Sequence, residues 1–207
     1  MKKLFFPVLI AFILWFVMFT PVNLPTHSIN FWLKMTVSTV LLIFLAFFID
    51  RKEICRSFRF SWKDLFSGIG SAVVLWGIFW LGNIVSTCIF PFAARQIDGV
   101  YAMKNGSNPV VICLLLLFLI GPAEEIFWRG FVQRNFTKNF GIVLSVGLTA
   151  LIYTLVHLPS FNFMLIMAAM VCGLFWGLLY YYNKNLLTVI ISHALWDCAV
   201  FILFPIS

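Results

Sequence analysis

The sequence is poor in charge, and acidic residues are the scarcer kind. Charged residues make up only 10% of the 207 residues, against 63% hydrophobic ones. A soluble domain of this length could not bury so much apolar surface, so lipid must cover part of the chain. The net charge of +7 comes from basic residues in the breaks between apolar runs, not from a basic stripe. This distribution is typical of a multi-pass membrane protein, and we expect no nucleic-acid partner.

The sequence motifs of several hydrolase classes are also missing. There is no GxSxG for a serine nucleophile and no HExxH for a zinc protease. Asp197 is the only aspartate within an apolar run, which excludes a paired-aspartate site. The five cysteines show no CxxC spacing, so we expect all five to pack as small hydrophobic residues.

Apolar runs recur along the whole chain and predict an all-α membrane protein with about seven transmembrane helices. The runs cover about 4–20, 31–49, 65–90, 109–133, 145–157, 161–182 and 186–204. We expect a basic loop at 50–64, a polar loop at 93–108 and a break at 137–141. The chain is predicted to form one integral membrane domain, 1–207, with its motif-bearing core at about 109–204 and further helices and loops over 1–108.

The positive charges also predict the topology. Lys2 and Lys3 precede the first apolar run, which lacks a small-x-small cleavage site and ends in a proline-rich loop at 21–25. We therefore expect a retained helix, not a signal peptide. With the N-terminus inside, ten of the fourteen Lys and Arg residues fall in inside segments. The predicted location is a bacterial cytoplasmic membrane with the N-terminus in the cytoplasm.

Six ionisable side chains interrupt the later apolar runs. A charge at the bilayer centre costs roughly 2.5–3.5 kcal/mol, so such groups are functional candidates. With a rise of 1.5 Å per residue, four of them on three helices converge at depths of about 14–20 Å. The six are Glu124, Glu125, Arg129, His157, His193 and Asp197.

Helical spacing suggests how these groups pair. Glu125 and Arg129 are four residues apart, which suits an ion pair, whether for the site or only for helix packing. Glu124 is offset by about 100° and can face a cavity. His193 and Asp197 share a helix face, as partners in a site or as a clasp between helices. A carboxylate and a histidine that hold one water, with donors opposite, suit amide hydrolysis.

Three ordered motifs resemble those of the CPBP (Abi) intramembrane endopeptidases, a family that includes the type II CAAX prenyl proteases. The similarity covers about 115–200. The motifs are Glu124-Glu125-x-x-x-Arg129-Gly130-Phe131, Tyr153-x-x-x-His157 and His193-x-x-x-Asp197.

The resemblance implies an intramembrane endopeptidase acting on a hydrophobic peptide or a membrane protein. Glu124 would be the catalytic base and would activate water together with His157. His193 and Asp197 would stabilise the tetrahedral oxyanion. Glu125 and the arginine of the first motif, Arg129, would support the site.

Two positions depart from the family pattern. Tyr153 stands where phenylalanine is usual, so its hydroxyl either joins the polar network or its ring only packs. Asp197 stands where asparagine is frequent, and an ionised aspartate would repel an oxyanion. We therefore expect Asp197 to act through His193, which it keeps as an imidazolium donor.

The resemblance implies a glutamate-type mechanism without a cofactor. A zinc-dependent version would use Glu124, His157 and His193 as ligands. The expected partners are membrane lipid and the peptide substrate, and we expect the site to open to the cytoplasmic leaflet. Two alternatives stay open: a non-catalytic scaffold, regulator or immunity protein that binds a membrane peptide, and a transporter that uses the buried acids as proton sites.

Overall fold

The chain folds into a bundle of helices. Its computed structural model describes residues 2–19 and 30–206. These residues contain no β-strand. Six helices are long and apolar enough to cross a membrane, and a shorter apolar helix precedes them. The all-α class with about seven spans is thereby confirmed. The α-helices of the described residues are α1 (Lys2–Phe19), α2 (Phe31–Arg56), α3 (Trp62–Ile89), α4 (Ala93–Tyr101), α5 (Pro109–Leu115), α6 (Gly121–Glu125), α7 (Arg134–Phe140), α8 (Ile142–Leu155), α9 (Phe163–Asn183) and α10 (Leu186–Cys198).

One long helix runs through the centre of the bundle. It is continuous over Pro109–Phe140, because the π-helical segments Leu116–Ile120 and Ile126–Gln133 join α5, α6 and α7. Such wide turns inside α-helices are frequent at functional sites. A third π-helical segment, Ala199–Leu203, extends α10.

Short polar residues begin most of the spans. The side-chain oxygens of Asn30, Ser61, Asn108, Asn162 and Asn185 each accept a hydrogen bond from a backbone N–H two or three residues later. These side chains satisfy donors that the first helical turn leaves free. They therefore fix where the membrane helices begin.

Three predicted breaks between the spans are wrong in part, and the one expected at 137–141 is helical up to Phe140. The segment expected as a basic loop at 50–64 is helical up to Arg56 and again from Trp62. The backbone kinks at Asp50, which pairs with Arg134 (2.6 Å), and an ion pair between Glu53 and Arg56 supports the turn that follows. The polar segment at 93–108 contains α4, which packs against α9. The proline-rich loop at 21–25 lies outside the described residues.

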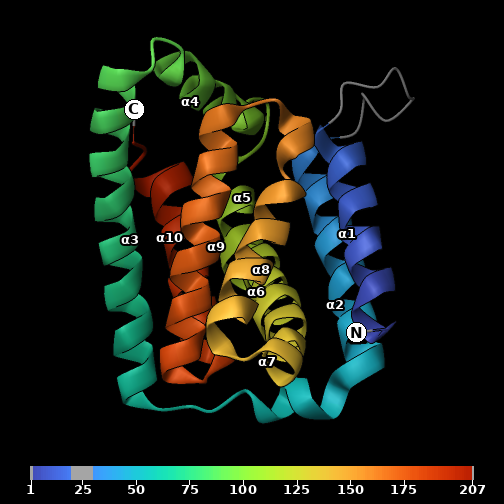
Figure 1. Cartoon of the computed structure of the whole chain (residues 1–207). Coiled ribbons are helices and arrows are strands. Elements are labelled where there is room, and N and C mark those ends of the chain that lie inside the picture. Colours follow the sequence, from blue (N-terminus) through green and yellow to red (C-terminus); the bar gives the residue numbers. More distant parts are fainter. Residues whose placement is uncertain (1, 20–29, 207) are drawn as a thin grey trace.

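The helices pack in pairs around the central helix (Figure 1). Helix α10 lies against α3 and α6, α8 lies against α9, and α1 lies against α2. Small residues allow the closest approaches. A Cβ on Gly121 would lie only 3.2 Å from Ala194 Cα, and one on Gly173 only 3.0 Å from Ala150 Cα.

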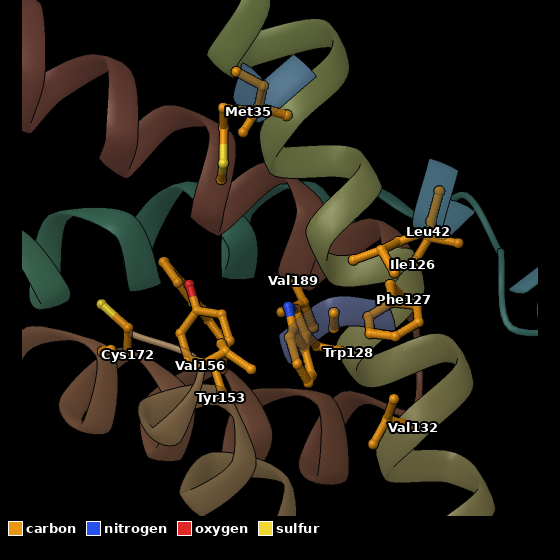
Figure 2. Packing of buried hydrophobic residues seen from close by; sticks show 14 of the residues in the cluster. Met35, Leu42, Ile126, Phe127, Trp128, Val132, Tyr153, Val156, Cys172 and Val189 are labelled. Atoms are coloured by element: carbon orange, nitrogen blue, oxygen red, sulfur yellow. The ribbon is translucent and has the colours of Figure 1, made fainter. Parts of the chain in front are cut away.

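Aromatic and aliphatic side chains fill the interior beside the polar residues. Figure 2 shows Phe127 and Trp128 of the central helix among other buried residues of this cluster. Trp128 packs edge-on against Tyr153 at 5.3 Å between ring centroids. Many other apolar side chains face outward, as expected for contact with lipid; Val143, for example, is 87% exposed.

The cysteines differ from the prediction. Cys113 of α5 and Cys198 of α10 form a disulfide, while Cys55, Cys88 and Cys172 are free. The two partners are 85 residues apart in sequence, and only helix packing brings them together. Both lie towards the end of the bundle opposite the N-terminus, where α5 begins and α10 ends.

Candidate active site

The six ionisable side chains are all buried. They come from three helical segments and from the end of a fourth helix. Each exposes 7% of its surface or less. Glu124 and Glu125 close α6, and Arg129 follows in the π-helical segment. The two residues of the last motif lie one turn apart on α10, and His157 follows the end of α8.

Glu125 links two of the predicted pairs. Its Oε1 accepts a hydrogen bond from Arg129 Nη1 (2.8 Å) and lies 2.7 Å from His193 Nδ1. The ion pair with Arg129 was expected from the spacing, whereas the contact with His193 was not. Within the described chain, Glu125 Oε2 has no hydrogen-bond partner. Glu125 therefore connects the first motif to the last one.

Both nitrogens of His193 face carboxylates. Nδ1 contacts Glu125, and Nε2 lies 3.3 Å from Asp197 Oδ2. A carboxylate can only accept, so this arrangement suits an imidazolium that donates from both nitrogens. The ring stacks on Trp176, with 3.7 Å between centroids and 19° between planes. The stack fixes the plane in which His193 can donate.

Arg129 is fully buried, and acceptors face its two Nη atoms, while its Nε has no hydrogen-bond partner in the described chain. Besides Glu125, its Nη2 donates to the carbonyl oxygens of Cys172 (3.3 Å) and Gly173 (3.1 Å) on α9. Its guanidinium carbon lies 5.3 Å from the ring centroid of Tyr153 and 5.6 Å from that of Trp176. These contacts compensate for desolvation of the cation and tie the central helix to α9.

Tyr153 contacts the predicted base. Its hydroxyl donates to Glu124 Oε2 at 3.0 Å. Of the two roles considered for this departure from the family pattern, the structure thus shows the hydroxyl in the polar network. The contact orients the Glu124 carboxylate from the side of α8.

His157 is held by groups other than Glu124. Its Nδ1 lies 2.6 Å from the carbonyl oxygen of Tyr153, and its Nε2 lies 3.3 Å from Trp15 Nε1. The indole N–H only donates, so Nε2 accepts and Nδ1 carries the proton. No hydrogen bond joins His157 to Glu124 among the described residues. A shared water is therefore the only way in which these two groups could act together here.

A cavity of about 450 Å³ brings the motifs together. Glu124, Tyr153, His157, His193 and Asp197 line it, and most of the remaining lining is apolar. The apolar lining comes largely from α1, α2, α3, α4 and α9.

The cavity lies at the end of the bundle opposite the N-terminus. Its lining includes Phe19 at the end of α1, Phe31 at the start of α2 and Tyr101 at the end of α4. Two expectations from the sequence, a cytoplasmic N-terminus and a site open to the cytoplasmic leaflet, are therefore incompatible.

Comparison with known families identifies the segment that carries these motifs. Residues 106–199 match the family described as type II CAAX prenyl endopeptidase Rce1-like. This segment is similar to the Rce1-like family. No curated protein and no solved structure matches the chain. The Rce1-like segment contains all six buried ionisable residues, and the family supports a function of the intramembrane protease type.

Other protein groups contact the three zinc ligands that the sequence offers. Among the described residues, no group of three or more His, Cys, Asp or Glu is placed to hold a metal ion. The nitrogens of His193 face two carboxylates, and those of His157 face a carbonyl and an indole N–H. The three ligands considered for a zinc-dependent version, Glu124 and these two histidines, do not fit a metal as they stand.

Two tryptophans of the site were not predicted from the sequence. Trp15, outside the Rce1-like segment, contacts His157, and Trp176 stacks on His193 and donates to Ser192 Oγ (3.2 Å). A tryptophan in an apolar run has the same appearance whether it faces lipid or a site. Sequence spacing therefore gave no signal for either.

Proposed function

We propose that this chain is an intramembrane endopeptidase that hydrolyses a peptide bond of a membrane-associated or hydrophobic peptide. The observation that carries the proposal is a buried carboxylate, Glu124, that lines an apolar cavity beside a neutralised pair of Glu125 and Arg129. A second carboxylate that is already paired leaves the first one available for proton transfer. The Rce1-like match supports the same reaction type.

In the proposed mechanism, Glu124 takes a proton from a water molecule in the cavity. The water oxygen bonds to the peptide carbonyl carbon, and the resulting tetrahedral oxyanion accepts a hydrogen bond from His193. The contact of His193 Nε2 with Asp197 is long, at 3.3 Å, so this N–H can turn towards the oxyanion while Glu125 holds the other nitrogen. The C–N bond then breaks, and Glu124 passes its proton to the leaving amine.

His157 and Tyr153 have assisting roles in this proposal. Tyr153 orients Glu124 through its hydroxyl. His157 lines the cavity wall, but its Nε2 accepts from Trp15, so it can help to orient the water only once Trp15 releases this nitrogen. Because the rest of the lining is mostly apolar, the cavity suits a hydrophobic stretch of substrate.

We further propose a bacterial cytoplasmic membrane with the N-terminus inside. The basic residues at the N-terminal end of the bundle support this orientation. The disulfide between Cys113 and Cys198 supports it too, because disulfides persist on the oxidising side of a membrane. In this orientation the cavity opens to the outer leaflet.

A non-catalytic peptide-binding protein is the second candidate. It is favoured by one observation, the engagement of His157 by Trp15 in place of Glu124. Such a protein would bind the same hydrophobic peptides in the cavity but would leave them intact.

Peptide cleavage by the purified protein separates the two candidates. Membrane peptides would be incubated in ¹⁸O-water with wild type, Glu124→Gln and the control Asp98→Asn, which changes an exposed acid of α4. Each would be tested with and without a chelator. The proposal predicts one ¹⁸O atom in each new C-terminal carboxyl group, with Glu124→Gln inactive and the chelator without effect. Peptides that bind but stay intact would establish the second candidate instead.

A further inference from the structure

A second cavity lies at the opposite end of the bundle from the proposed active site. It has a volume of about 330 Å³ and lies between α7, α8 and the end of α9. Arg134, Lys138 and Lys184 line it, together with the hydroxyl-bearing residues Tyr180 and Tyr181. No acidic residue belongs to this lining within the described chain.

The cations of this cavity are only partly neutralised. Arg134 donates its Nη2 to Asp50 (2.6 Å) and its Nη1 to Glu53 (3.3 Å), and Lys138 Nζ lies 3.7 Å from Glu53. Arg134 Nε is buried and has no partner in the described chain. Lys184 forms no ion pair with any described residue.

The two carboxylates are themselves shared with other cations. Lys3 lies 4.0 Å from Asp50, and Arg56 lies 3.0 Å from Glu53. Together with Arg134 and Lys138, four cations thus face two carboxylates. The surroundings of the cavity keep a positive excess that can attract an anion.

The N-terminus of a helix adds to this field. Helix α8 begins after Gly141, which has φ +73° and cannot offer a side-chain cap. Ile142 and Ser145 of its first turn line the cavity. The free N–H groups and the dipole at a helix N-terminus favour a negatively charged group.

We propose that this cavity binds the phosphate of an anionic phospholipid headgroup. A lipid headgroup and free phosphate share the same binding chemistry, in which a phosphate monoanion or dianion lies among three cations. The outward side of α8 favours lipid over free phosphate, because Ile142, Val143 and Leu144 are 41%, 87% and 51% exposed beside the cavity. Acyl chains can lie along these residues while the headgroup contacts the cations. Basic pockets between helices at a cytoplasmic membrane surface suit such headgroups.

Lipid binding by the purified full chain tests the proposal. Delipidated protein in neutral detergent would be titrated with phosphatidylglycerol, phosphatidylcholine and inorganic phosphate, with bound lipid counted by native mass spectrometry. The test variant Lys138→Gln/Lys184→Gln would be compared with Lys52→Gln/Lys63→Gln, which removes two exposed lysines at the same end of the bundle, outside the cavity.

The expected result is preferential binding of phosphatidylglycerol, weakened about 30-fold in the test variant and less than threefold in the control variant. Equal loss in both variants would show diffuse surface attraction and would overturn the site. Equal binding of phosphatidylcholine would overturn recognition of the anion. Complete displacement of the lipid by millimolar inorganic phosphate would overturn the assignment to a lipid and favour a free anion as the ligand.

Discussion

Arg129 offers a quantitative test of how the site is built. Its side chain is fully buried and pairs with Glu125 at 2.8 Å. It also donates to two carbonyl oxygens of α9. The substitution Arg129→Met keeps much of the length of the side chain but leaves the Glu125 carboxylate without its guanidinium partner. It also leaves both carbonyls without this donor.

Breaking a buried ion pair on one side costs about 3–5 kcal/mol. For a chain of this length, 1 kcal/mol lowers the melting temperature by about 2–4 °C, so we expect a decrease of roughly 6–20 °C. Arg129→Lys should fall between this value and wild type, because an ammonium keeps the charge but cannot reproduce the planar fork. The matched control is Arg56→Met, which removes an exposed pair with Glu53 and should cost about 0–1 kcal/mol.

Thermal unfolding in detergent, followed by tryptophan fluorescence, measures these differences. Adding Glu125→Gln to Arg129→Met should restore part of the lost stability, because residue 125 is then neutral, and the weakened contact with His193 limits the gain. Equal melting temperatures for Arg129→Met and Arg56→Met would refute the view that this ion pair is a buried organiser of the site.

Three further substitutions test the polar network and the helix packing. Asp197→Asn should keep cleavage activity but move the alkaline limb of the pH–rate profile to lower pH, because a neutral amide no longer supports the His193 imidazolium; an unchanged profile would contradict this role. Tyr153→Phe should lower kcat/KM roughly tenfold to a hundredfold through loss of its hydrogen bond to the catalytic carboxylate, and unaltered kinetics would show that the ring only packs. Gly121→Ala should destabilise the protein by about 1–3 kcal/mol, because its Cβ would lie 2.9 Å from the carbonyl oxygen of Leu116 in the same helix and 3.2 Å from Ala194 Cα of α10. The control Gly77→Ala has nothing within 4 Å and should be close to neutral in a denaturant or thermal melt.

Much of the fold follows from the sequence because the bilayer imposes a simple rule. Apolar runs of sufficient length become helices, and Asn or Ser before a run fixes its start. The errors lie where tertiary contacts overrule this rule. The charged segment after Asp50 is helical up to Arg56, and contacts with distant residues, such as the ion pair of Asp50 with Arg134 at the kink, accompany it. The disulfide of Cys113 with Cys198 depends on packing between helices that are distant in sequence.

The site shows the same division. Spacing along one helix predicts pairs such as Glu125 with Arg129, and the structure contains that pair. Contacts between helices are beyond such reasoning, as the hydrogen bond of Glu125 with His193 and that of Trp15 with His157 show. The catalytic roles assigned to these residues stay predictions until activity is measured.

The most direct test of the central claim is the cleavage rate of Glu124→Gln relative to wild type on one cleaved membrane peptide. Glutamine keeps the shape of the side chain and can still accept the hydrogen bond from Tyr153, but it cannot take a proton from water. The account predicts a loss of about 10²–10⁴-fold in kcat, with the melting temperature unchanged or higher, since a buried charge is removed. A variant that folds normally and cleaves at the wild-type rate would contradict the assignment of Glu124 as the base.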